Sequence, residues 1–185
     1  MRSEAQGDNE RLSRLGSITK KYKIAKGESD IRGWDVVTSD HRKIGKVHDL
    51  IVDTAAMKVR YLEIEVDRKI LGTKTDSRVL VPIAGATLDG EDARVYINDV
   101  TSTKLTAIPA YDARVINRDY ETMLLGLFGT ATEPASTDVN RDFYDQADFA
   151  DRGFWAKRRA GREEAAYIVP GQDDAIEEPA DQPRR

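Results

Sequence analysis

The sequence predicts a mainly β protein: a small antiparallel β-barrel with a short C-terminal helix and extended N- and C-terminal arms. Residues 58–67 (KVRYLEIEVD) alternate in the manner of a half-buried strand. Leu62 and Ile64 share its apolar face, while Glu63 and Glu65 lie on the other, where we expect water or a polar partner. Short apolar runs also recur on both sides of this segment between turn-like residues, a spacing typical of small antiparallel barrels.

Each strand follows from a short apolar run. We expect strands at residues 34–38, 44–53, 58–67, 78–82 and 94–98, turns at 39–42 and 85–92, and a polar loop at 68–77. Within residues 44–53, Val47 and Leu50 lie on opposite parities, which indicates a bulge near His48 and Asp49. Such a bulge would bend the strand as a small barrel requires.

The C-terminal helix begins after Asn117, a residue type that caps helices well. Its apolar residues fall at helical spacing: Tyr120, Met123, Leu124, Leu127 and Phe128. We interpret it as a helix that packs on its own barrel. The chain then divides into a basic arm (1–29), the barrel (30–110), a closing segment with the short helix (111–129) and an aromatic, charged arm (130–185).

Composition limits the function classes. Of the 185 residues, 39% are hydrophobic and 34% are charged, the formal net charge is −4, and there is no cysteine. The negative charge argues against a general nucleic-acid binder, and the missing cysteines exclude disulfides and thiolate metal sites. No apolar run approaches the roughly 20 residues of a membrane span, and the start lacks a signal-peptide core. We expect a soluble, cytoplasmic protein.

The N-terminal arm is basic from residue 11 to residue 26 and has no acidic residue there. Its cations are Arg11, Arg14, Lys20, Lys21, Lys23 and Lys26. One interpretation is a lead-in that packs a few apolar side chains on the barrel. The other is contact with an anionic surface, either lipid head groups or an acidic protein, where each cation contributes roughly 1 kcal/mol.

The C-terminal arm is polar yet carries large aromatic side chains. Those with a predicted role are Phe143, Tyr144, Phe149, Phe154 and Trp155. Aromatic side chains in a polar segment are typical of anchors that bury on a partner, so we expect contact with a partner protein. The alternatives are an arm that wraps its own domain or one that stays disordered.

Apolar residues also interrupt the polar loop at residues 68–77. Ile70 and Leu71 stand inside it. We expect these two side chains either to cover the end of the barrel or to contact a partner.

Candidate catalytic residues are few. His41 and His48 have Asp40 and Asp49 nearby, but this spacing matches no known metal-ligand pattern. Glu63 and a second glutamate on one strand face could act as glycosidase carboxylates, although solvated Glu-x-Glu pairs are common. No phosphate-binding glycine loop and no nucleophile elbow is present. We interpret the chain as a non-enzyme that binds no metal or cofactor itself.

Four segments together resemble one family. IRGWDVV, KIGKVHDLIVD, KVRYLEIEV and RVLVPI occur in this order, and residues of roughly 30 to 110 resemble a PRC-barrel domain. The closest resemblance is to the cytoplasmic domain of the photosynthetic reaction-centre H subunit, through RYLEIEV, the PI-ending strand and NRDYETML. The transmembrane helix that begins typical H subunits has no counterpart in this sequence.

The resemblance implies a non-catalytic subunit that caps a photosynthetic reaction centre at the cytoplasmic face of the membrane. It would stabilise the secondary-quinone side and assist proton delivery. Quinone and bacteriochlorophyll would belong to the membrane subunits, and a separate chain would supply the transmembrane helix. A family glutamate falls at Ala56, so the relay would use Asp49, Asp53 or Glu63. Asp53 can also shape its turn, and Arg60 can pair with an acid to fix the barrel against a neighbour.

Two other roles follow from other branches of the family. One is a soluble stand-alone PRC-barrel adaptor or stress-response protein, expected to be a homodimer. The other is a ribosome-assembly adaptor, which normally carries another domain before the barrel. The N-terminal segment is too short and polar for that domain, so this role ranks last.

Overall fold

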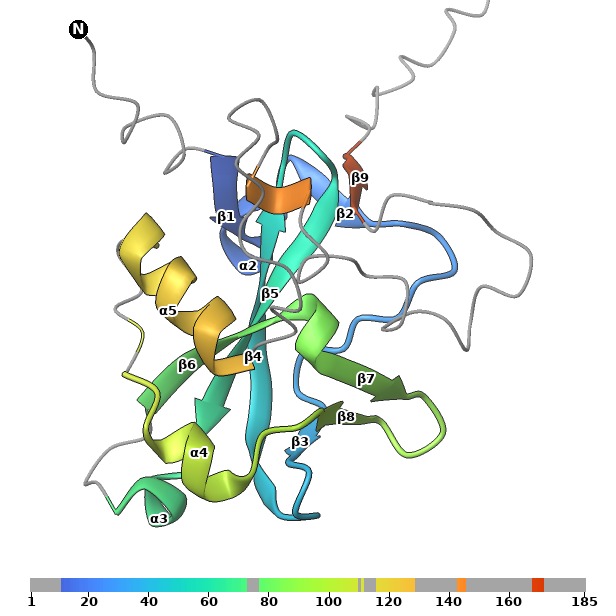
Figure 1. Ribbon diagram of the computed structural model, residues 1–185. Helices are drawn as coiled ribbons and strands as arrows, with labels where there is room; N and C mark the ends of the chain where they lie inside the picture. The colour runs from blue at the N-terminus through green and yellow to red at the C-terminus, as the bar shows by residue number, and fades with distance from the viewer. Residues whose placement is uncertain are drawn as a thin grey trace, which may run out of the picture.

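A curled sheet organises the chain in the computed structural model, which describes residues 11–72, 77–109, 111, 116–128, 143–145 and 168–171 (Figure 1). The seven-stranded sheet has the order β6-β5-β4-β3-β8-β7, and β1 pairs with β4 off this path. Its strands are β1 (Leu12–Arg14), β3 (Asp35–Val37), β4 (Lys43–Asp53), β5 (Lys58–Val66), β6 (Ser77–Pro82), β7 (Ala86–Asp89) and β8 (Arg94–Ile97). The predicted mainly β, barrel-like fold is confirmed.

The β4–β5 hairpin is the centre of the sheet, and its register places two irregularities in β4. The pairing shifts between Val47 and Asp49 and again between Ile51 and Val52. The predicted bulge at His48 is therefore confirmed. Because a bulge bends a strand, one edge of β4 can pair with β3 near its start and with β1 near its end.

Two details of the sheet differ from the expectation. The β3–β8 pair is parallel, so the sheet is not purely antiparallel. The turn predicted at residues 85–92 is wrong in part, since Ala86–Asp89 forms β7 and pairs antiparallel with β8. Only Ala86 and Leu88 of this strand are buried, and two apolar residues give too short an alternation to distinguish a strand from a turn.

Both faces of β5 are buried along most of the strand, while Glu65, on the face predicted to meet water or a polar partner, keeps a side chain that is 43% exposed. Tyr61 and Glu63 are each 0% exposed, as are Leu62 and Ile64 on the opposite face. The α5 helix (Arg118–Phe128) packs against β6 beside this strand (Figure 1). Glu63 faces the polar partner that the sequence left as its alternative to water, namely the guanidinium group of Arg14.

Short helices close the ends of the sheet. They are α2 (Leu15–Ile18), α3 (Arg68–Leu71), α4 (Ser102–Thr106) and two 3-10 turns, η2 (Ile83–Gly85) and η3 (Phe143–Asp145). The predicted polar loop therefore contains a helix. The Asp67 carboxylate caps it by accepting the Lys69 backbone N–H at 2.8 Å. Gly72 ends it in the left-handed region at φ 64°, which glycine adopts without a steric penalty.

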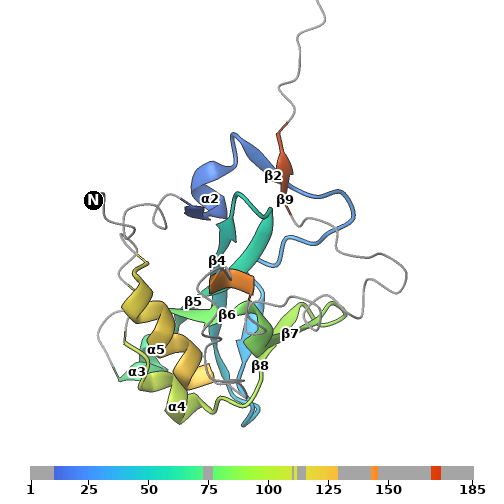
Figure 2. The same ribbon diagram turned by 45° about the horizontal axis from the view of Figure 1, so that its top comes forward.

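A separate two-stranded ribbon joins the two arms. In it β2 (Tyr22–Ile24) pairs antiparallel with β9 (Ile168–Pro170), although the two strands are far apart in sequence. Figures 1 and 2 both show this ribbon at the top of the molecule, at the opposite end from α3. Within the described ranges, no helix is long and apolar enough to cross a membrane.

The helix cap predicted at Asn117 is confirmed. Its side-chain oxygen accepts the Tyr120 backbone N–H at 2.9 Å. Asn117→Ala is expected to lower the free energy of unfolding by about 1 kcal/mol, because an N–H at the start of α5 loses its acceptor. Urea unfolding followed by circular dichroism measures this loss. Asn117→Asp keeps a capping oxygen and should lose much less, whereas equal losses in both variants would show that the cap is unimportant.

Candidate functional site

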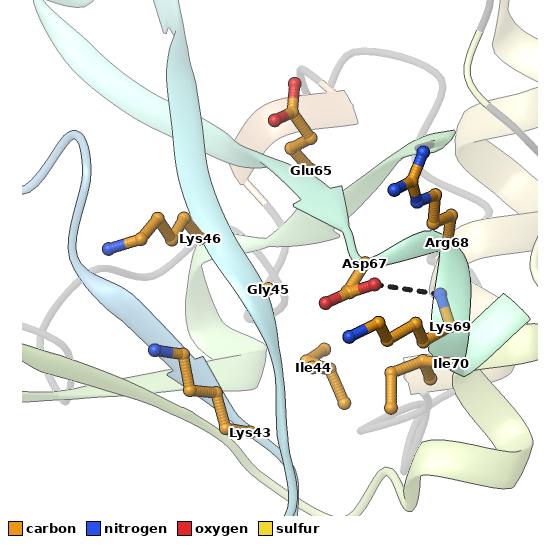
Figure 3. Close-up of a pocket in the computed structure, with 9 residues that line it drawn as sticks. All are labelled: Lys43, Ile44, Gly45, Lys46, Glu65, Asp67, Arg68, Lys69 and Ile70. Carbon is orange, nitrogen blue, oxygen red and sulfur yellow. Dashed lines mark hydrogen bonds between the residues drawn. The ribbon is translucent and has the colours of Figure 1, made fainter. Parts of the chain in front are cut away.

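A groove opens between the start of β4, the end of β5 and the helix α3 (Figure 3). Its volume is about 710 Å³. The lining side chains and backbone come from Lys43, Ile44, Gly45, Lys46, Glu65, Asp67, Arg68, Lys69 and Ile70. One residue predicted to contact a partner, Ile70, thus lies on the groove wall. Its neighbour Leu71 is half-buried in α3 and packs against the core.

Charges of both signs surround the groove. The Lys43 and Lys46 ammonium groups bind the Asp35 carboxylate at 2.7 and 3.0 Å. Asp67 is occupied by capping α3, as the dashed line in Figure 3 shows. Among the described residues, the Lys69 ammonium makes no ion pair, so this cation is available to an incoming group. Such a lining suits a polar polypeptide segment that carries an acidic side chain and some apolar surface.

The groove floor depends on a close approach between two backbones. A Cβ placed on Gly45 would lie 2.0 Å from the Glu65 carbonyl oxygen. Only glycine allows β4 and β5 to come together in this way at the groove. A larger residue in place of Gly45 would therefore change the shape of the groove and also destabilise the β4–β5 hairpin.

A buried ion-pair cluster lies at the other end of the β4–β5 hairpin. Asp53 is fully buried and meets the Arg11 guanidinium at 2.7 Å and the Arg60 guanidinium at 3.0 Å. Its second oxygen accepts the backbone N–H groups of Ala55 and Ala56 at 3.1 and 3.0 Å. The alternative interpretation of Asp53, as a residue that shapes the turn, is confirmed by these hydrogen bonds.

Burial and hydrogen bonding shift the pKa of Asp53 in opposite directions. Burial raises its pKa, but hydrogen bonds from Arg11, the Ala56 N–H and Arg60 outweigh that effect and leave the pKa below its usual value of 3.8. A carboxylate held ionised in this way is a poor proton carrier near neutral pH. The ion pairs therefore disfavour Asp53 as a step in a proton relay.

The other two carboxylates proposed for a relay are also occupied. Glu63 is fully buried and pairs with Arg14, while Arg78 approaches the same oxygen at 3.6 Å. Asp49 is almost buried and accepts the Gly16 backbone N–H at 3.1 Å. These contacts fix the N-terminal segment to the sheet. They give Glu63 and Asp49 structural partners. From Glu63, ion pairs continue through Arg78 to the partly exposed side chains of Glu65 and His48.

Tyr144 completes the cluster from the C-terminal side. Its ring lies 5.0 Å from the Arg11 guanidinium carbon and 5.2 Å from that of Arg60, within cation–π range. The Tyr144 hydroxyl and the Tyr61 hydroxyl both donate to one Glu121 oxygen, at 2.9 and 2.7 Å. Burial together with the Glu121 charge raises the pKa of Tyr61, which therefore stays protonated.

The sequence did not identify Glu121 as a site residue, although one signal was present. Tyr61 shares the strand face of Glu63, and a buried tyrosine hydroxyl needs a partner. An acidic residue on the covering helix is such a partner. Glu121 was recognisable only as an acid that favours the first turn of α5.

Several predicted contact residues turn inward. Arg11 and Arg14 direct their guanidinium groups to the buried Asp53 and Glu63, and each side chain is 25% exposed. Tyr144 is 2% exposed on its own barrel, where it cannot act as an external anchor. Phe143 is half-buried under the Arg118 guanidinium, at 3.7 Å from the ring centroid.

Arg60, predicted to pair with an acid and fix the barrel against a neighbour, is buried and pairs with Asp53 of its own chain. The other predicted contacts divide into two sets. The lysines do face outward: Lys20, Lys21, Lys23 and Lys26. The other set lies outside the described residues: Phe149, Phe154 and Trp155.

The Asp53 pairs predict a pH dependence. The pKa of Asp53 is lower in the folded chain, so its contribution to stability is present above pH about 4 and is lost as the pH falls through the folded-state pKa. One such group adds a slope of at most about 1.4 kcal/mol per pH unit. Urea unfolding between neutral and acidic pH should show that the free energy of unfolding falls less steeply with decreasing pH in Asp53→Asn than in the wild type. Identical slopes would contradict this assignment.

The curled sheet, its central bulged hairpin and the short closing helices define a small barrel-type β domain. A comparison with protein families shows which one: the PRC-barrel domain matches residues 26–104. These residues form a PRC-barrel domain, as the sequence resemblance predicted. The matched region runs from just after β2 into α4, so both arms of the ribbon lie outside it. A search of curated proteins finds no match to the chain.

Proposed function

We propose that the chain is a non-catalytic, stand-alone PRC-barrel adaptor that binds one partner protein through the groove between β4 and α3. The groove itself carries this proposal. It is open, has a volume of about 710 Å³, and combines apolar walls at Ile44 and Ile70 with charged groups of both signs. A surface of this kind recognises a polypeptide segment through shape and charge and requires no reactive group.

The internal ion pairs support an adaptor over a proton-conducting subunit. Asp53 and Glu63 each meet two arginines, and both side chains are fully buried. Their charges hold the N-terminal segment on the sheet. A stand-alone domain needs such internal contacts, because it has no membrane subunit to cover its buried carboxylates.

The second candidate is the cytoplasmic cap of a photosynthetic reaction centre. The PRC-barrel match and the four outward-facing lysines favour it. In this role the chain would stabilise the secondary-quinone side of membrane subunits that hold quinone and bacteriochlorophyll. It would contribute less to proton delivery than the sequence resemblance implied, because the candidate relay carboxylates are paired. A homodimer is a further arrangement open to the stand-alone adaptor.

Site-specific photo-crosslinking in the native cell tests the groove. A photoreactive residue at Lys69 is expected to capture one defined partner protein, and the same residue at Glu91, an exposed position in the β7–β8 turn, should not capture it. Ile70→Glu should abolish the Lys69 crosslink, because it places a charge on the apolar wall.

The crosslinking result has clear contrary outcomes. Capture of the same proteins from both positions, or capture that survives Ile70→Glu, contradicts the groove as the partner site. Capture of the chain by itself from Lys69 identifies the partner as a second copy.

A further inference from the structure

We propose that the ribbon β2–β9 and the residues beside it form a docking surface for an anionic lipid bilayer. We call this the lysine surface, and its cations are Lys20, Lys21, Lys23 and Lys26. This inference goes beyond the adaptor role, because it concerns a different end of the molecule and a different ligand.

The first observation is that these cations are both exposed and unpaired. All four lysines are exposed, and within the described residues none of them makes an ion pair. Residues 11–27 contain no aspartate or glutamate. Elsewhere several cations are neutralised, Lys43 and Lys46 by Asp35 and Arg94 by Asp92, and the cations without an ion pair among the described residues are dispersed along the chain, as at Arg42, Lys69 and Lys104. A chain of net charge −4 thus carries a local cluster of four lysines between residues 20 and 26.

The second observation is that the pairing of β2 with β9 fixes the backbone at Lys23. Lys23 lies directly opposite Val169, so the two side chains share one face, and Ile24 lies opposite the fully buried Ile168 on the other. The Gly171 N–H donates to the Lys21 carbonyl oxygen at 2.7 Å and ties the start of β2 to the end of β9.

The third observation is an apolar side chain among the charges. Val169 is 38% exposed and is the exposed large hydrophobic residue within the described part of the chain. A valine beside lysines can enter the head-group layer while the ammonium groups stay among the phosphates.

The chemistry of the cations favours a bilayer over a stereospecific anion site. Outward-facing cations here are lysines, since Arg11 and Arg14 of the same segment turn inward. Lysine is a hydrated point charge on a flexible stem, whereas arginine supplies the planar fork that recognises an individual phosphate or carboxylate. A cluster of exposed lysines on and beside the ribbon therefore fits a diffuse anionic surface.

The two proposed surfaces do not compete. In Figures 1 and 2 the ribbon β2–β9 lies at the top of the molecule and α3, on the groove, lies near the bottom. A bilayer bound at the lysine surface therefore leaves the groove open to a partner protein. The chain could then hold that partner at a membrane.

Vesicle sedimentation of the full chain tests the proposal. Binding is expected to vesicles of phosphatidylcholine mixed with phosphatidylglycerol, to weaken as salt is raised, and to be absent with phosphatidylcholine alone. The triple substitution Lys20→Gln, Lys21→Gln and Lys23→Gln should weaken binding by roughly a hundredfold, since each lysine near such a surface contributes about fivefold. Val169→Ser should weaken it by about threefold.

A matched control removes the same charge elsewhere. Arg42→Gln, Arg94→Gln and Lys104→Gln together should leave vesicle binding within about twofold, and both triple variants alter only exposed side chains, so both should fold. Equal losses in the two triples would overturn the proposal, as would no binding of the wild type at low salt. Tighter binding to polyglutamate than to the anionic vesicles would overturn it in favour of an acidic protein.

Discussion

Gly45→Ala is expected to lower the free energy of unfolding by at least about 3 kcal/mol. The added Cβ would lie 2.0 Å from the Glu65 carbonyl oxygen and 3.1 Å from the Val66 Cα. Both are backbone atoms of the central hairpin, so no side chain can rotate away. The strands must separate locally and lose ladder hydrogen bonds between β4 and β5, which costs more than ordinary overpacking.

Urea unfolding monitored by circular dichroism measures the effect, and the chain contains a matched control. Gly126 lies within α5, and among the described residues no atom outside its own helix backbone and chain neighbours lies within 4 Å of its ideal Cβ position. Gly126→Ala should raise stability by about 0.5–1 kcal/mol, because alanine favours the helix interior. A loss below about 1 kcal/mol for Gly45→Ala would mean that the two strands do not approach this closely.

The second large effect concerns Arg60. Arg60→Met is expected to cost about 3–5 kcal/mol, because it removes one partner from a buried ion pair. The guanidinium donates to Asp53 at 3.2 and 3.0 Å and to the Tyr144 carbonyl oxygen at 3.1 Å, and the side chain is 5% exposed. Methionine fills much of the same space, so the loss reports mainly on charge and hydrogen bonds.

The same unfolding measurement separates charge from packing. In Arg60→Met the Asp53 carboxylate keeps Arg11 as its one cationic partner among the described residues. Adding Asp53→Asn removes that charge while an oxygen remains for the turn, so the double variant should be less destabilised than the sum of the two single variants. Arg42→Met, at an exposed position, should change stability by less than about 0.5 kcal/mol. Strict additivity would contradict the ion-pair account.

Local patterns predicted much of the fold. The strand at residues 58–67 and the bulge near His48 follow from apolar parity, which neighbouring residues determine. Asn117 is likewise a local signal, since its side chain caps the turn that follows it. Such features depend on a few adjacent residues and can be identified without tertiary information.

Long-range contacts account for what the sequence did not predict. Glu63 was expected to meet water or a polar partner. The partner is Arg14, which lies 49 residues away in sequence, so local patterns could not identify it. Tyr144 was expected on a partner protein, but its site is formed by arginines and a glutamate from distant segments. The spacing of apolar residues along the chain carries no information about these long-range side-chain contacts.

The candidate site was predicted only in part. Ile70 was recognised as an apolar residue inside a polar loop that would cover the end of the barrel or contact a partner. It lines the groove and also packs against the core. The groove itself arises because α3 lies beside the start of β4, more than twenty residues away in sequence, and because Gly45 allows a close backbone approach. The sequence does not distinguish the arginines from the lysines of the basic N-terminal arm. In the structure, Arg11 and Arg14 pair with buried carboxylates, whereas the four lysines of the same run are exposed.

The adaptor account is tested most directly by the native assembly of the chain. Membranes and cytosol are solubilised gently and fractionated by size, and mass spectrometry locates the wild type and Ile70→Glu. We predict that the wild type elutes with one partner protein in a complex larger than the free chain, and that Ile70→Glu elutes free. Elution of both with reaction-centre membrane subunits, or of both alone, would contradict the groove-based adaptor.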